Sequence, residues 1–272
     1  MLSRRGFLGA CVGAAGAAVA PVGWYGAFYE RGNLEVVRRT MSVPNLPARL
    51  DGLTAVQVSD LHLVRTTDLH VRMVELVQAL NPDLVFVTGD LVDDHSAVGE
   101  VVDLLRNLSP PRGLWAVAGN WDHTAEAVDL LDDALSTAGM HFLVDEARQL
   151  DDGLWLVGVD DPSTGNDNLN DAVAQVPARA NKLLLAHSPE IVHSLDNRRF
   201  DLVLAGHTHG GQVNLPMING GWTKEGPTRR YLEGLFNVKG SRMYVNRGIG
   251  TTHVPIRIGA RPEITHFTFR GS

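Results

Sequence analysis

Five short apolar runs in this chain are each followed by side chains that can bind metal ions. An apolar run of this length that ends near a glycine or a polar residue is typical of a buried β-strand. The runs are residues 53–58, 84–88, 114–118, 182–186 and 201–205. The side chains that follow them are Asp60 and His62, Asp90, Asn120, His187, and His207 with His209. Polar residues at the carboxyl ends of strands mark the place where α/β proteins form their sites.

The segments between the first strands have helical periodicity. Residues 68–80 are predicted to form a helix that ends at Asn81-Pro82. Its apolar face consists of Leu69, Met73, Leu76, Val77 and Leu80. Two more helices are predicted at 98–108 and 125–138, the second followed by Gly139 at its C-terminal end. This alternation of strands and helices predicts an α/β fold.

The second half of the chain is predicted to contain more strand than helix. Strands at 141–144, 148–150 and 154–159 are expected to run antiparallel. Pro189 suits the first turn of a short helix. Further strands are predicted at 34–43, 243–245 and 264–269. The simplest architecture is two mixed sheets packed together with helices outside, in one domain that spans residues 30–272.

Residues 1–29 differ from the rest of the chain. The Arg4-Arg5 pair precedes an apolar stretch of small residues, Gly9–Gly23, which is typical of a twin-arginine export signal. The stretch is short for a membrane span. Ala18-Val19-Ala20 resembles a cleavage site, although Pro21 disfavours cleavage there. We expect export to the cell envelope, with a membrane tether if the signal is retained. The alternative is a basic N-terminus on a short core helix.

Net charge and cysteine content bear on two further questions, namely whether the protein binds nucleic acid and whether it forms disulfides. The formal net charge is −7 with both signs spread along the chain, which argues against a basic, nucleic-acid-binding face. We therefore expect no nucleic-acid partner, and the sequence sets no oligomeric state. The one cysteine, Cys11, lies within residues 1–29, so residues 30–272 form no disulfide.

The polar residues at the strand ends could have ordinary structural roles or could bind metal ions. Asp60, Asp90 and Asn120 could cap helices or occupy turns, and His207 and His209 could lie on a surface turn. An extended backbone would direct both of these rings the same way. Together, however, the seven side chains form a mixed imidazole and carboxylate set, which suits Mn, Fe or Zn. Seven ligands are too many for one tetrahedral ion. They suit two ions if one carboxylate bridges them, and Asp90 is the expected bridge.

These residues, in this order, resemble the calcineurin-like metallophosphoesterase superfamily. The resemblance rests on Asp60-x-His62, Gly89-Asp90, Gly119-Asn120, His187 and Gly206-His207-x-His209. The stretches His207–Gln212, Gly248–Gly250 and Pro255–Arg257 resemble its secreted, twin-arginine-exported bacterial branch. The likeness runs from about residue 34 to the end, and it implies a four-layer α/β/β/α sandwich with a dinuclear metal centre. By position, one ion would be held by Asp60, His62, Asp90 and His209, and the other by Asp90, Asn120, His187 and His207.

The resemblance implies hydrolysis of a phosphomonoester, phosphodiester or pyrophosphate. Two ions would share a water and lower its pKa, which would provide hydroxide near neutral pH, and Asp90 would be the shared carboxylate. In one respect the chain departs from the superfamily. A histidine that helps the leaving group usually follows the Gly-Asn pair, but this chain has Trp121, which cannot act as an acid. His123 is the expected replacement as a catalytic residue, with His95, Arg229 and Arg230 as alternatives.

Several functions are compatible with these residues. The first is an envelope phosphoesterase whose substrate comes from the cell envelope or is linked to a lipid. Some relatives of this branch hydrolyse the pyrophosphate of UDP-2,3-diacylglucosamine, which is a narrower alternative. Another is a catalytically weak envelope protein that keeps its metals, because Trp121 replaces the expected histidine. A metallo-β-lactamase-like hydrolase is disfavoured because no His-x-His-x-Asp-His run occurs.

Overall fold

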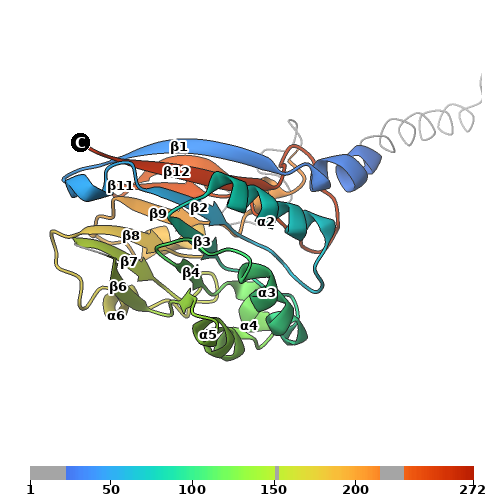
Figure 1. Ribbon diagram of the computed structural model, residues 1–272, viewed down its shortest axis with the longest axis horizontal. Helices are drawn as coiled ribbons and strands as arrows, with labels where there is room; N and C mark the ends of the chain where they lie inside the picture. Colours follow the sequence, from blue (N-terminus) through green and yellow to red (C-terminus); the bar gives the residue numbers. More distant parts are fainter. Residues whose placement is uncertain (1–22, 151–152, 215–229) are drawn as a thin grey trace, which may run out of the picture.

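Two six-stranded sheets form the centre of the molecule (Figure 1). The computed structural model describes residues 23–150, 153–214 and 230–272. The first sheet has the strand order β1-β12-β2-β3-β4-β5, and all of its neighbours are parallel except β12 and β2. Its strands are β1 (Glu35–Val43), β2 (Thr54–Val58), β3 (Leu84–Thr88), β4 (Leu114–Val117), β5 (His141–Phe142) and β12 (Glu263–Gly271).

The second sheet has the order β10-β11-β9-β8-β7-β6. The three central pairings of this sheet are parallel and the two outer ones are antiparallel, so it is mixed like the first. Its strands are β6 (Glu146–Leu150), β7 (Leu154–Gly158), β8 (Asn181–Leu185), β9 (Leu202–Ala205), β10 (Gly234–Val238) and β11 (Ser241–Val245).

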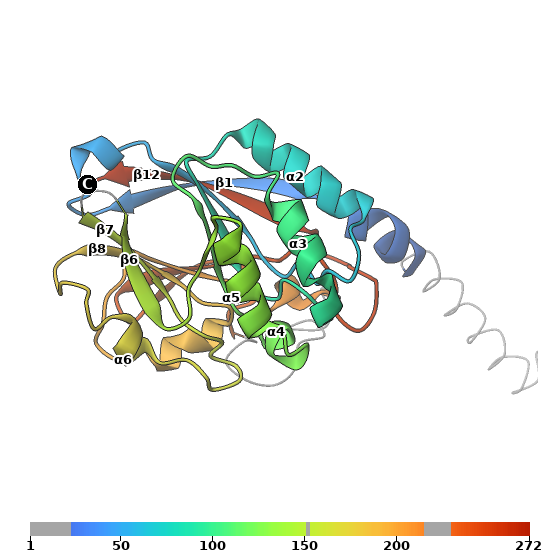
Figure 2. The same ribbon diagram turned by 60° about the horizontal axis from the view of Figure 1, so that its bottom comes forward.

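Helices cover the outer faces of both sheets (Figures 1 and 2). The first sheet is covered by α2 (Asp68–Leu80), α3 (Val98–Leu105), α4 (Asn120–Thr124) and α5 (Val128–Thr137). The second is covered by the shorter α6 (Leu169–Ala172) and η6 (Pro189–His193). The remaining short helical turns are η1 (Tyr25–Tyr29), η2 (Glu30–Gly32), η3 (Ala48–Leu50), η4 (His95–Ala97) and η7 (His209–Gly211). This arrangement confirms the predicted α/β/β/α sandwich.

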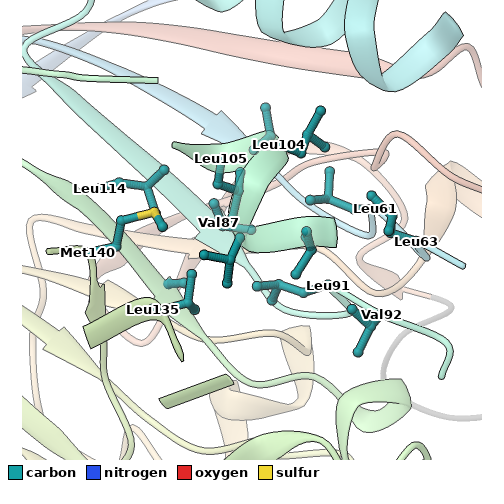
Figure 3. Packing of buried hydrophobic residues seen from close by; sticks show 14 of the residues in the cluster. Leu61, Leu63, Val87, Leu91, Val92, Leu104, Leu105, Leu114, Leu135 and Met140 are labelled. Atoms are coloured by element: carbon teal, nitrogen blue, oxygen red, sulfur yellow. The ribbon is translucent and has the colours of Figure 1, made fainter. Parts of the chain in front are cut away.

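Strand residues alternate between separate apolar layers. In β3, Val85 and Val87 face the layer under the helices (Figure 3), whereas Leu84 and Phe86 face the layer between the sheets. In β8, Leu184 faces the outer helices of the second sheet, and its neighbours face the layer between the sheets. Both sheets are therefore buried on both faces. This explains why the central strands are continuous apolar runs rather than alternating ones.

Local sequence sets the bounds of α2, the longest helix among the described residues. Thr67 precedes α2, and its side chain and backbone N–H both bond with His70 in a capping box. Asn81 follows the helix with φ of 46°, a left-handed residue that satisfies the last turn. The predicted helix at 68–80 is therefore confirmed.

Several local predictions need correction. The strand at 141–144 is shorter than expected, and it joins the first sheet parallel to β4 instead of pairing antiparallel with its neighbours. A strand that follows a crossover helix such as α5 returns parallel to the strand before that helix. The helix predicted at 125–138 begins only at Val128 (α5), because Glu126 has φ of 53° and interrupts the chain between α4 and α5. The short helix α4, at Asn120–Thr124, was not predicted. β10 was not predicted.

The N-terminal prediction lies mostly outside the described residues. Residues 23–29 belong to the described part of the chain and include the turn η1 (Tyr25–Tyr29). In the ranges that the structure describes, no helix is both long enough and apolar enough to cross a bilayer.

Candidate metal centre

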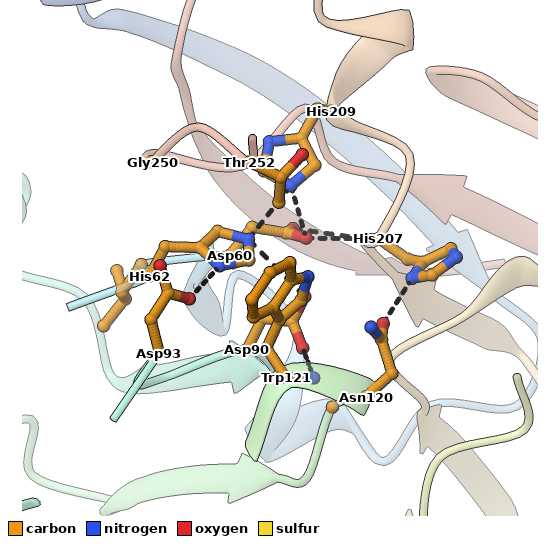
Figure 4. A network of polar contacts seen from close by, with 12 residues as sticks. Asp60, His62, Asp90, Asp93, Asn120, Trp121, His207, His209, Gly250 and Thr252 are labelled. Carbon is orange, nitrogen blue, oxygen red and sulfur yellow. Dashed lines mark hydrogen bonds and ion pairs between the residues drawn. The ribbon is translucent and has the colours of Figure 1, made fainter. Parts of the chain in front are cut away.

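Loops at the carboxyl ends of five strands meet at one edge of the two sheets (Figure 4). The loops after β2 and β3 run side by side, with Asp60 N donating to Gly89 O at 3.0 Å. Asp122 connects the loops after β3 and β4, because its carboxylate accepts from Gly119 N at 2.9 Å and from Leu91 N at 2.9 Å. His207, which follows β9 of the second sheet, donates from its backbone N to Oδ1 of Asp60 at 3.0 Å, so residues from the two sheets meet at this edge.

The first cluster contains Asp60, His62 and His209. Nε2 of His62 lies 3.1 Å from Nε2 of His209, and Nε2 of His209 lies 3.4 Å from Oδ1 of Asp60. All three residues are buried. Two imidazole nitrogens and a carboxylate oxygen thus converge on one small volume, which is the donor set of a transition-metal site.

The second cluster contains Asp90, His187 and His207, with Asn120 beside them. Nδ1 of His207 lies 3.1 Å from Nε2 of His187 and 2.8 Å from Oδ1 of Asn120. His187 and Asp90 are buried, whereas His207 and Asn120 are partly exposed. The second cluster is therefore more accessible to solvent than the first, on the side of His207 and Asn120.

Asp90 lies between the two clusters. Its Oδ2 atom is 3.2 Å from Nε2 of His187 in the second cluster and 3.5 Å from Nε2 of His62 in the first. Its other oxygen accepts a hydrogen bond from Trp121 N at 2.8 Å. One carboxylate oxygen thus faces the donor atoms of both clusters, which is the geometry that a bridging ligand requires.

The backbone at this edge is unusual. Asp60, His62, Asp90, His207 and His209 all have positive φ, between 48° and 71°. Non-glycine residues rarely adopt this conformation, and such strain concentrates at functional sites. The expectation of an extended backbone at His207 and His209 is therefore wrong. Their rings point into different clusters because left-handed residues change the chain direction at each histidine.

Two glycines let the backbone approach the carboxylates. A Cβ atom on Gly206 would lie 1.9 Å from Oγ of Ser59 and 2.5 Å from Oδ2 of Asp60. A Cβ atom on Gly119 would lie 2.3 Å from the backbone N of Asp90 and from its Oδ1. Any side chain at these two positions would displace a cluster residue, so glycine is required there.

Burial and the charges of neighbouring residues both shift the pKa values of the clustered groups. Some of these pKa values are raised and others are lowered. Burial raises the pKa of Asp60. Burial would also raise the pKa of Asp90, but the adjacent His187 lowers it below its usual range. For His187, burial favours the neutral ring, yet the charge of Asp90 raises its pKa well above the ordinary value. Burial, with His187 second, lowers the pKa of His207 to about 4. A bound cation would compensate for burying so many ionisable groups together.

Hydrogen bonds behind the clusters fix the orientation of three rings. His62 donates from Nδ1 to Oδ1 of Asp93 at 2.6 Å, and His187 donates from Nδ1 to Thr88 O at 2.8 Å. Each bond leaves Nε2 free to bind a metal. Arg257, which is fully buried, places Nη2 3.1 Å from Nδ1 of His209. Asp93 and Arg257 were not singled out as functional, although both lie in motifs that the sequence made visible.

Trp121 covers the first cluster. Its ring lies edge-on to His62 with centroids 5.7 Å apart, and His253 lies edge-on to it at the same separation. Figure 4 shows Trp121 in front of Asp90, with Thr252 above. Gln212 fixes the loop of His253, since its side chain donates to Thr252 O at 2.9 Å and accepts from Thr252 N at 2.9 Å. His253 is thus a second imidazole near the site that sequence reasoning missed.

The other expected leaving-group residues lie in different settings. Nε2 of His123 donates to Oδ1 of Asp160 at 2.6 Å, and the histidine is partly exposed. His95 is exposed at the start of η4. Arg230 places its guanidinium over the ring of Tyr231, 5.7 Å from the centroid. Arg229 lies outside the described residues.

Known proteins match this chain along most of its length. The family model described as calcineurin-like phosphoesterase matches residues 53–211, which include all seven clustered side chains. An uncharacterized metallophosphoesterase of Bacillus subtilis, YkuE, is 33% identical over 100% of this chain and 99% of its own. The phosphodiesterase YaeI of Escherichia coli is 30% identical over 97% of this chain and 98% of its own.

A more distant relative and a solved structure extend the comparison. The UDP-2,3-diacylglucosamine pyrophosphatase LpxG of Chlamydia trachomatis is 27% identical over 85% of this chain and 88% of its own. Among solved structures, TT1561 of Thermus thermophilus has a TM-score of 0.52 at 12% identity, covering 73% of this chain and 90% of its own. That structure supports the fold alone.

Proposed function

The chain belongs to the calcineurin-like phosphoesterase family and is a hydrolase of phosphoric ester bonds, and on this premise we propose that it acts through two metal ions held by the seven clustered side chains. The observation that carries the proposal is the position of Asp90, whose Oδ2 lies 3.2 Å from His187 and 3.5 Å from His62. A single carboxylate oxygen between two clusters of metal-binding groups suits a pair of ions better than one.

The donor atoms divide naturally into two sets. Four residues would hold the first ion, namely Asp60, His62, Asp90 and His209, and four would hold the second, namely Asp90, Asn120, His187 and His207. Nitrogen and oxygen donors in these proportions fit Mn, Fe or Zn. When bound, the ions would supply an activated water and electrophilic contacts to the phosphoryl oxygens.

Protein groups would then complete the reaction. Asp90 would hold the two clusters at a fixed separation. Asn120 would orient the ring of His207 on the solvent-exposed side of the second cluster. A leaving alkoxide needs a proton, which imidazole supplies well near neutral pH. His123, oriented by Asp160, is one candidate donor, and His253 beside Trp121 is the other.

The substrate class is the narrower part of the proposal. We favour a phosphodiester or a pyrophosphate over a monoester, because the full-length relative YaeI is a phosphodiesterase and LpxG is a pyrophosphatase. The likeness to LpxG also supports a second candidate, hydrolysis of a UDP-2,3-diacylglucosamine-type pyrophosphate. The twin-arginine motif supports export to the cell envelope as the place of action.

A substrate panel with defined metals tests the proposal. The full chain is stripped of metal and reloaded with Mn, Fe or Zn. Hydrolysis of bis-nitrophenyl phosphate, nitrophenyl phosphate and a lipid-free UDP-sugar pyrophosphate is then measured. We expect turnover of at least one diester or pyrophosphate with two ions per chain, and none with Asp90→Asn. Two bound ions without turnover of any phosphoester would instead support a catalytically weak metal-binding protein.

A further inference from the structure

Four aromatic side chains are exposed on one short helical segment at the N-terminal end of the described chain. Trp24 is 64% exposed, Tyr25 44%, Phe28 72% and Tyr29 55%. Their rings form two neighbouring pairs: the centroids of Trp24 and Phe28 lie 5.7 Å apart, and those of Tyr25 and Tyr29 lie 5.2 Å apart. Aromatic residues normally bury most of their surface, so a contiguous exposed group of four indicates a contact surface.

This aromatic segment (Trp24–Tyr29) is attached firmly to the domain. Gly26 is buried, and a Cβ atom there would lie 2.6 Å from Cγ1 of Ile258. Its carbonyl accepts from Arg257 N at 3.2 Å, while the buried Glu30 accepts from Ala260 N at 3.0 Å. Figures 1 and 2 show the segment at one end of the molecule. The aromatic rings are therefore presented on a fixed base.

The neighbouring sequence indicates what covers these rings. Residues 7–23 contain no charged side chain, and they end directly at Trp24. Trp and Tyr prefer the interface between lipid headgroups and hydrocarbon, where the ring is buried and its polar atom stays hydrated. We propose that the aromatic segment docks in the headgroup layer of a lipid bilayer.

A second copy of the chain is a poorer occupant. At about 150–250 Å² for each aromatic side chain, the exposed parts of four rings offer roughly 500 Å². Stable protein–protein interfaces bury about 800 Å² on each partner. The patch by itself is therefore too small for a stable dimer, whereas binding to a lipid interface has no such minimum area and strengthens with each apolar side chain that is inserted.

The docking surface is connected to the candidate metal centre through one loop. Arg257 bonds to Gly26 with its backbone and approaches His209 with its side chain. His253, four residues earlier, lies against Trp121. Docking would thus hold the loop that packs against the first cluster, and with it the domain, at a membrane that carries lipid-linked phosphodiesters or pyrophosphates. This consequence for the substrate rests on the proposed function, but the docking itself does not.

Vesicle co-sedimentation tests the docking. The full chain is mixed with vesicles of phosphatidylethanolamine and phosphatidylglycerol, and Trp24→Ala with Phe28→Ala is compared with the parent. Val64→Ala with Leu235→Ala is the matched control, because these side chains are exposed to a similar degree elsewhere (54% and 48%). Both comparisons are repeated with Val12→Asp and Val19→Asp, so that residues 7–23 no longer bind lipid by themselves.

In the Val12→Asp and Val19→Asp background, we expect the aromatic variant to have a vesicle-bound to free ratio roughly tenfold or more below that of the parent, because two large apolar side chains are lost from the lipid interface. The control variant should bind vesicles as the parent does. Equal binding of the aromatic variant and the parent would overturn the proposal. Conversion of a dimer into a monomer by the aromatic substitutions, with vesicle binding unchanged, would overturn it in favour of a second copy. If the chain binds vesicles through the aromatic segment but hydrolyses no phosphoester, the docking proposal is supported and only the proposed function is contradicted.

Discussion

His207 and His209 are separated by a single residue, yet their rings belong to different clusters (Figure 4). Nδ1 of His207 lies 3.1 Å from Nε2 of His187, whereas Nε2 of His209 lies 3.1 Å from Nε2 of His62. Positive φ values of 71° and 51° produce this divergence. One short loop therefore contributes to both candidate ion sites.

The first prediction follows from that divergence. His207→Ala and His209→Ala should each lose about one of two ions, and a different one, because each ring serves one cluster only. Both variants should lose nearly all turnover. Metal analysis by mass spectrometry, combined with the spectrum of a cobalt-substituted chain, identifies the ion that is lost. His95→Ala, an exposed histidine in η4, is the control. Unchanged stoichiometry in both variants would mean that the two histidines bind no metal.

The second prediction concerns the carboxylate between the clusters. Asp90→Asn keeps the shape of the side chain but removes its charge, so two cations would repel each other across an uncharged amide. We expect turnover to be abolished and metal content to fall below that of Asp60→Asn, which lacks a charge in only one cluster. Two tightly bound ions in Asp90→Asn would rule out the bridging role.

The third prediction concerns the partner of His62. Asp93→Ala removes the acceptor 2.6 Å from Nδ1, which orients the ring. Loss of such a partner typically weakens metal binding by about 10–100-fold, and we expect a decrease of that size measured by competition with a chelator. Asp94→Ala is the neighbouring control, because Asp94 caps η4 instead. Equal metal affinity in the two variants would show that Asp93 is only structural.

The fourth prediction distinguishes the two candidate proton donors. General-acid help is typically worth about 10²–10⁴-fold, and a good leaving group such as nitrophenolate needs little of it. Either His123→Ala or His253→Ala should therefore slow alkyl diester hydrolysis far more than nitrophenyl ester hydrolysis, with metal content unchanged. The variant with the leaving-group-dependent loss identifies the donor. If both variants slow hydrolysis of alkyl and nitrophenyl esters equally, neither histidine is the proton donor. The metal ions would then stabilise the leaving group.

The fifth prediction concerns location. Arg4→Lys together with Arg5→Lys should block export through the twin-arginine route, because that route reads the arginine pair itself and not merely positive charge. The folded domain should remain active in the cytoplasmic fraction, which cell fractionation with the phosphodiester assay measures. Envelope recovery equal to that of the parent would show that the pair is an ordinary basic N-terminus.

Much of the fold follows from local sequence. The central strands are buried on both faces, so they appear as continuous apolar runs, and their order along the chain predicted the layered α/β arrangement. The polar residues after β2, β3, β4, β8 and β9 were likewise visible, because the strand ends are marked by glycines and turn residues. The helix α2 could be predicted with its bounds, since Thr67 and Asn81 cap it locally.

Only the tertiary structure decided how these residues meet. The assignment of β5 to the first sheet depends on a long-range pairing that a two-residue strand cannot specify by itself. The left-handed backbone at His207 and His209 depends on contacts such as that of His207 N with Asp60, which come from the other sheet. Arg257 and His253 approach the centre because their loop packs against Gln212 and Gly26. Local propensity determined which residues end the strands, whereas non-local packing determined which atoms face each other.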